Sequence, residues 1–104
     1  MKTVEIAPRK KLPLYGNLIK REAEIRRNGR GTFSRKGPRR AGTTTWGHKR
    51  FKGTVSLKRG DAELVSARIR SATPEDEGSL LKAFLGFVDR HCGNQVATIT
   101  IHYQ

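Results

Sequence analysis

The residues best suited to chemistry form one continuous stretch, RRNGRGTFSRKGPRRAGTTTWGHKRFKG, at positions 26–53. It holds ten Lys or Arg, six Gly, one Pro and three aromatic residues, and it contains no Asp or Glu. Arg binds phosphate oxygens through a planar fork of N–H donors, Lys binds them as a point charge, and Gly lets the backbone come close. The pattern predicts a site for a polyanion. The cations expected to contact phosphates are Arg26, Arg27, Arg30, Arg35, Lys36, Arg39, Arg40, Lys49, Arg50 and Lys52.

Two further residues of the stretch extend this predicted site. Trp46 lies among the cations, and an aromatic ring stacked on an unpaired base contributes about 1–3 kcal/mol per base. This contact favours RNA or single-stranded DNA over a duplex; the alternative is that Trp46 anchors the segment to the core. His48 is flanked by Lys49 and Arg50 and is included in the nucleic-acid site. Together with His102 it is also a candidate for acid–base cleavage of RNA without a metal.

Other kinds of chemistry find little support. The one Cys and three His lack the spacing of a zinc site, so neither a metal nor a cofactor is expected. No Ser or Cys lies in a recognisable nucleophile turn. The acidic run Glu75–Glu77 is explained by its place at a helix N-terminus, where negative charge is favourable. The sequence therefore predicts a binding protein and not an enzyme, with a small metal-independent ribonuclease of the toxin kind as an alternative.

The charge is distributed unevenly along the 104 residues. The net charge is +13, of which the first sixty residues carry +15 and the remainder −2. Such a basic front predicts nucleic acid as the partner. A second hypothesis is an interaction module that binds an acidic protein or a ribonucleoprotein.

The sequence argues against a membrane and leaves the oligomeric state open. No segment approaches the roughly 20 apolar residues that span a bilayer. The stretch 14–27 has a thin apolar stripe without Trp or Phe, unlike a membrane-surface helix. The N-terminus lacks the apolar run of a signal peptide, so a cytoplasmic location is expected.

Residues 51–104 predict a β-β-α-β core. Thr73 suits the N-cap of a helix over 73–92, Pro74 its first position and Gly93 a left-handed terminator. The alternation of 96–103 predicts a strand. Before the helix, strands at 51–59 and 63–71 are expected to form a hairpin around Gly60-Asp61. The apolar stripe of the helix is Leu81, Phe84, Leu85, Val88 and Cys92.

The preferred register of this hairpin pairs Leu57 with Val65 and puts Arg59 opposite Glu63. With the last strand beside the first, the order becomes 2-1-3, and the helix covers one face. The last strand then runs parallel to the second. The free face is expected to be rich in hydroxyls and cations, which makes it a second candidate binding surface. Its basic side chains are Lys52, Lys58, Arg68, Arg70 and His102.

Residues 1–50 predict a basic segment without a core of its own. A short strand is expected at 3–6 and a helix at 14–27, ended by Asn28-Gly29. Residues 29–45 show no usable periodicity and are expected to form a mobile loop. The predicted fold is thus one α+β domain: a small antiparallel sheet, one helix packed on it, and a partly flexible N-terminal half.

Overall fold

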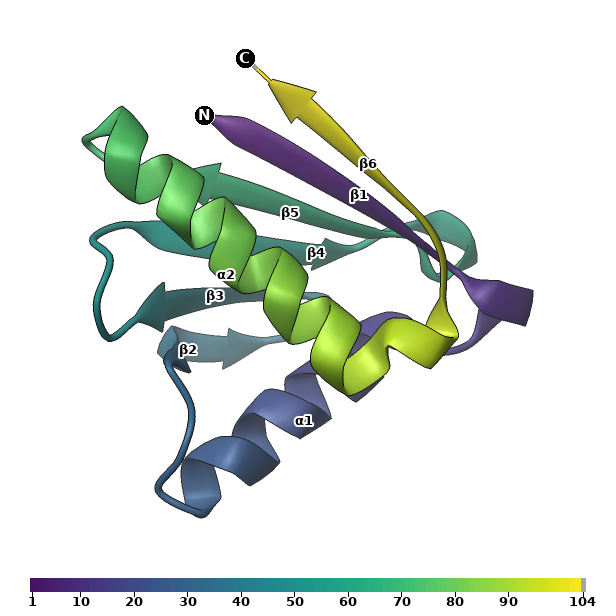
Figure 1. Cartoon of the computed structure of the whole chain (residues 1–104). Coiled ribbons are helices and arrows are strands. Elements are labelled where there is room, and N and C mark those ends of the chain that lie inside the picture. Colours follow the sequence, from purple (N-terminus) through teal and green to yellow (C-terminus); the bar gives the residue numbers. More distant parts are fainter. Residues whose placement is uncertain (104) are drawn as a thin grey trace.

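A single antiparallel sheet of six strands, in the order β2-β3-β4-β5-β1-β6, organises the computed structural model (Figure 1). The structure describes residues 1–103, apart from the side chain of Arg39. The strands are β1 (Lys2–Pro8), β2 (Phe33–Arg40), β3 (Thr43–His48), β4 (Thr54–Arg59), β5 (Val65–Arg70) and β6 (Val96–Tyr103). The two helices are α1 (Leu14–Arg27) and α2 (Pro74–Cys92).

Both helices lie on the same face of the sheet, where α2 crosses the strands diagonally and α1 lies toward the β2 edge (Figure 1). Their apolar faces and the inward side chains of β1 to β5 form one continuous core. Neither helix is long and apolar enough to cross a membrane, within the described residues. The predicted strand at 3–6 and the helix at 14–27 are both present.

The predicted helix over 73–92 is confirmed, including its start. The Thr73 hydroxyl accepts a hydrogen bond from the Asp76 backbone N–H at 3.2 Å, and Pro74 occupies the first helical position. The prediction for its end is wrong, because Gly93 has right-handed dihedral angles (φ −56°, ψ −36°). The chain instead continues into a 3₁₀ turn, Gly93–Gln95, that leads into β6.

The prediction of a mobile loop at 29–45 is also wrong. These residues build most of the β2–β3 hairpin, in which Phe33 pairs with His48 and Arg35 with Trp46. The two aromatic rings at this hairpin are buried against α2: the ring centroids of Trp46 and Phe87 are 5.1 Å apart, and those of Phe33 and Phe87 are 6.0 Å apart. Burial of these large apolar side chains outweighs the polar, glycine-rich composition around them. The N-terminal half is therefore folded.

The predicted strand order 2-1-3 is wrong because β1 lies between β5 and β6. It pairs antiparallel with β5 on one side and with β6 on the other, so β6 does not touch the β4–β5 hairpin. Val4 and Ile6 of β1 are fully buried, which shows how much apolar surface this strand contributes. The helix-covered sheet is correct in kind, but it has six strands instead of the three of the predicted core, and the predicted helix at 14–27 packs on the same face as the other helix.

The register of the β4–β5 hairpin differs from the predicted one by two residues. Leu57 pairs with Ala67, and Arg59 pairs with Val65. The loop Gly60–Leu64 is longer than a tight turn and is closed by a hydrogen bond from the Gly60 N–H to the Leu64 carbonyl at 2.7 Å. A shift of two residues keeps every side chain on its predicted face. The expected attraction between Arg59 and Glu63 survives as an ion pair across this loop.

Trp46 lies at the centre of the core, with no exposed surface. We therefore expect Trp46→Ala to lower the free energy of unfolding by about 3–5 kcal/mol, and Trp46→Phe to lower it by less. Urea denaturation followed by circular dichroism measures both. An alanine variant within about 0.5 kcal/mol of wild type, as for a surface substitution, would contradict this placement.

Candidate anion-binding grooves

The face of the sheet opposite the helices carries cations and hydroxyls side by side. Ser56 pairs with Arg68, Thr54 with Arg70 and Lys58 with Ser66, so side chains of both kinds lie next to one another on β4 and β5. We call this the outer face. It has the composition that strand alternation predicts for it, except that Lys52 precedes β4. Arg68 and Lys58 are exposed to solvent.

A groove of about 800 Å³ runs over the outer face, and we call it the outer groove. One wall is the hairpin segment around the β2–β3 turn, and the floor is formed by hydroxyl-bearing residues of β3, β4 and β5. The lack of a side chain at Gly47 makes room for the Lys36 stem, which lies where a Cβ would otherwise stand. Glu5 is the one acidic residue among the described lining residues. The cations that line it are Lys36, Arg40, Lys58 and Arg68.

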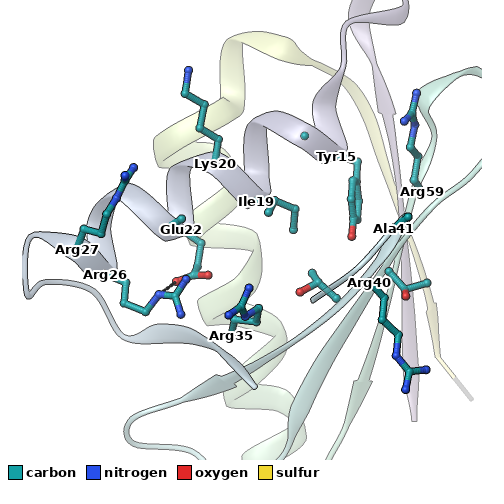
Figure 2. A pocket seen from close by; sticks show the side chains of 15 residues that line it. Tyr15, Ile19, Lys20, Glu22, Arg26, Arg27, Arg35, Arg40, Ala41 and Arg59 are labelled. Carbon is teal, nitrogen blue, oxygen red and sulfur yellow. Dashed lines mark ion pairs between the residues drawn. The ribbon is translucent and has the colours of Figure 1, made fainter. Parts of the chain in front are cut away.

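A second groove, of about 740 Å³, lies between α1 and the β2–β3 hairpin on the helix side of the sheet (Figure 2). We call it the helix groove. Arg26 from α1 and Arg35 from β2 approach Glu22, whereas Lys20 and Arg27 extend outward from the helix. Tyr15 directs its hydroxyl toward the hairpin. The cations that line this groove are Lys20, Arg26, Arg27, Arg35, Arg40 and Arg59.

Among the described residues, Glu22 is the one charged side chain that is buried, with 3% of its surface exposed. Its Oε2 atom lies 3.1 Å from Nε of Arg26 and is not aligned for a hydrogen bond with any described group. Burial raises the pKa of Glu22, against the opposing effects of the Arg26 and Arg35 charges and of hydrogen bonding from the Arg35 backbone. The carboxylate therefore pairs with the Arg26 guanidinium, has the Arg35 charge nearby, and is itself poorly solvated.

The two grooves adjoin at the β2–β3 turn, because Arg40, Thr43 and Thr44 line both of them. Together they present nine different Lys and Arg residues and two carboxylates, counting only the described lining residues. Positive potentials of neighbouring cations add in a concave surface, so the path from α1 around the hairpin to the outer face attracts anions.

Five of the predicted cations line the two grooves, and four others with described side chains line neither. Arg26, Arg27, Arg35 and Arg40 line the helix groove, and Lys36 and Arg40 line the outer groove. Arg30 lies in the connection after α1. Lys49, Arg50 and Lys52 lie in the connection between β3 and β4 and line neither groove. The side chain of Arg39 lies outside the described part of the chain.

The prediction that Trp46 stacks on a base is wrong, because its ring is fully buried. Strand alternation turns it toward the helices, where it packs against Phe84 and Phe87. The alternative of a core anchor is the correct one. Phe33, the other aromatic residue of the hairpin, is also buried.

His48 is placed by aromatic packing. Its ring stacks on Phe51 with centroids 4.7 Å apart, and its Nδ1 atom accepts a hydrogen bond from the Arg50 backbone N–H at 3.0 Å. Burial and the nearby Arg50 charge lower the pKa of His48. At neutral pH this imidazole is therefore mainly uncharged and contributes little to phosphate binding.

His48 and His102 do not form one site. His102 lies on β6, where its Nε2 atom is 3.6 Å from Oε1 of Glu5. Three strands separate β3 from β6, which corresponds to about 19 Å at 4.8 Å per strand. Acid–base chemistry that uses both imidazoles on one phosphate is excluded by this separation.

Four cations and both carboxylates of the grooves were not in the predicted phosphate site: Lys20, Lys58, Arg59, Arg68, Glu5 and Glu22. Strand alternation did place Lys58 and Arg68 on the outer face. The connection of Lys58 and Arg68 with α1 depends on the β2–β3 hairpin, which carries Arg35 and Lys36 and was not predicted. Within residues 1–103, no cluster of three or more His, Cys, Asp or Glu side chains could hold a metal ion.

Comparison with family models, with curated proteins and with solved structures found no match for this chain.

The buried Glu22 gives a prediction for stability against pH. Because its pKa is raised in the folded protein, the folded state binds a proton more readily than the unfolded state. The contribution of Glu22 to stability is therefore most favourable below the usual carboxyl pKa and is lost as the pH rises through the raised value. We expect the stability of wild type relative to Glu22→Gln to fall as the pH rises above the usual carboxyl pKa of about 4.3.

Urea midpoints of both proteins at a series of pH values measure the difference. Glu24→Gln, on the same helix, is the control. The stability of wild type relative to Glu24→Gln should not fall in this way as the pH rises. A wild-type stability that is constant or rising relative to Glu22→Gln would show that Glu22 is well solvated or fully compensated.

Proposed function

We propose that this protein binds nucleic acid through its phosphates, which follow the helix groove and the outer groove around the β2–β3 hairpin. The observation that carries the proposal is the junction of the two grooves at Arg40, Thr43 and Thr44. A ligand on this path meets cations from α1, β2, β4 and β5. An extended polyanion can contact all of them, whereas a single small anion would leave most of them unneutralised.

The outer groove has cations that are ready to bind. Among the described side chains, Lys36, Lys58 and Arg68 take part in no ion pair. Each can therefore neutralise a phosphate without first losing an internal partner. The Ser and Thr hydroxyls between them are donors of the kind that contact phosphate and sugar oxygens. Contacts of this type fix orientation and do not read sequence.

The burial of Trp46 and Phe33 changes the expected mode of binding. Neither ring lies on the grooves, so the contact that favoured RNA or single-stranded DNA is missing. The proposal therefore covers nucleic acid in general, bound by charge and groove shape. Counterion release supplies the affinity, so binding should weaken as salt concentration increases.

A matched pair of double variants tests the grooves against net charge. Lys58→Ala with Arg68→Ala removes two exposed cations of the outer groove, and Lys82→Ala with Arg90→Ala removes two exposed cations of α2. Both variants lose the same formal charge. Fluorescence anisotropy with a labelled oligonucleotide, measured over a series of salt concentrations, reports the affinity and its salt dependence.

We expect the groove variant to bind more weakly and to lower the magnitude of the slope of log affinity against log salt. The reduction should be about 1.4 on a single strand, from about 0.7 per phosphate contact, or about 1.8 on a duplex. The α2 variant should retain the wild-type slope. Equal losses in both variants would show that binding follows net charge alone, and no binding by wild type at low salt would overturn the proposal.

A further inference from the structure

The strand β6 forms one edge of the sheet and is unusual for an exposed edge. Its sequence, VATITIHY, contains no Asp, Glu, Lys, Arg, Pro or Gly. Its one irregularity lies at its start, where Ala7 pairs with Thr98 but Pro8 pairs with Val96. From Thr98 to Tyr103 the pairing with β1 is regular, so the opposite side of β6 presents an extended row of backbone donors and acceptors.

The other edge of the same sheet, β2, is protected in the usual way. It contains Lys36, Gly37, Pro38 and Arg40, and its register with β3 is interrupted between Lys36 and Arg40. Charges, Pro and irregular pairing are the devices by which natural sheets prevent edge-to-edge association. β2 has all three devices, whereas β6 has only the shift at its start, so its segment from Thr98 to Tyr103 is unprotected.

Apolar surface accompanies the free edge. Ile99 and Tyr103 point to the helix side of the sheet, since they pair with Ile6 and Lys2, and they are 38% and 70% exposed. Ile101 lies between them and is half-buried. In Figure 1, α2 crosses β5, β4 and β3, whereas most of β6 lies clear of it. A strand added beside β6 would cover this row.

We propose that β6 pairs antiparallel with β6 of a second copy of this chain, around a two-fold axis at Thr100. In this register Ile99 of each copy lies beside Ile101 of the other, on the helix side of the joined sheet. Thr98 lies beside His102 on the outer face. Every cross-strand neighbour is then apolar with apolar or polar with polar, so the strand is complementary to itself.

The distribution of charge favours a second copy as the partner. Two copies of a chain with net charge +13 repel each other, so they can associate best where the cations are fewest. The edge β6 lies at the opposite end of the sheet from β2 and carries no Lys or Arg. An acidic partner would be drawn to the grooves instead of to this neutral edge.

Such a dimer would also suit a long polyanion. This consequence rests on the proposed function, whereas the pairing of the two β6 strands does not. A two-fold axis perpendicular to the sheet keeps both outer faces on the same side. At about 4.8 Å per strand, the two outer grooves would lie about 40 Å apart. This is the length of about 12 base pairs, so one nucleic acid could contact both copies.

Sedimentation equilibrium of nuclease-treated protein, at a salt concentration high enough to screen charge, tests the pairing without any nucleic acid. We expect twice the chain mass of 11.7 kDa for wild type. Ile99→Lys should give the monomer mass, because it places a charge opposite Ile101 of the second copy. Thr43→Lys, which adds the same charge at an exposed position of β3, should remain a dimer.

Thr100→Cys gives a second measurement that does not depend on the folding of the lysine variant. Mild oxidation should link two chains through residue 100, and Thr43→Cys should not be linked. A wild type that stays monomeric at concentrations up to about 200 µM would overturn the proposal. So would a dimer that persists in the Ile99→Lys variant, if the Thr100→Cys variant also fails to form the cross-link. A dimeric wild type that binds no nucleic acid would count against the proposed function alone.

Discussion

The contact between the β2–β3 hairpin and α2 is the constraint on which the rest of the structure depends. Phe33 and Trp46 from the hairpin meet Phe84 and Phe87 from α2, with the centroids of neighbouring rings 5.1 to 6.2 Å apart. Two buried aromatic rings attach a glycine-rich, strongly basic segment to the core. Because the segment is fixed, Arg35, Lys36 and Arg40 have defined positions, and the wall shared by both grooves exists.

This arrangement has an electrostatic cost. Fixing many like charges on one small sheet raises the energy of the folded state, and there are few internal acids to offset it. The buried Glu22 offsets part of the cost within the helix groove, at the expense of its own desolvation. The outer groove has no comparable buried acid among its described residues. An anionic ligand would stabilise the fold by binding the folded state preferentially, which links the stability of the protein to its proposed role.

Regular patterns in the sequence predicted part of this fold, and the reasons are local. Capping by Thr73 and Pro74 defined the start of α2, and alternation defined β6 and the two faces of the β4–β5 hairpin. The β2–β3 hairpin escaped prediction because only two of its residues carry the apolar signal. The position of β1 escaped because it depends on pairing with strands more than fifty residues away. Trp46 was ambiguous for the same reason: its direction depends on a strand that composition did not reveal.

The central claim is that cations from separate elements converge into one path for a polyanion. Amide chemical-shift changes on titration with a short oligonucleotide test it most directly, because they locate the ligand residue by residue. The account predicts changes along β2 and the β2–β3 turn, on β4 and β5 near Lys58 and Arg68, and on α1 near Arg26. The exposed side of α2 should remain unaffected. Changes centred on α2, or scattered over all surfaces, would contradict the account.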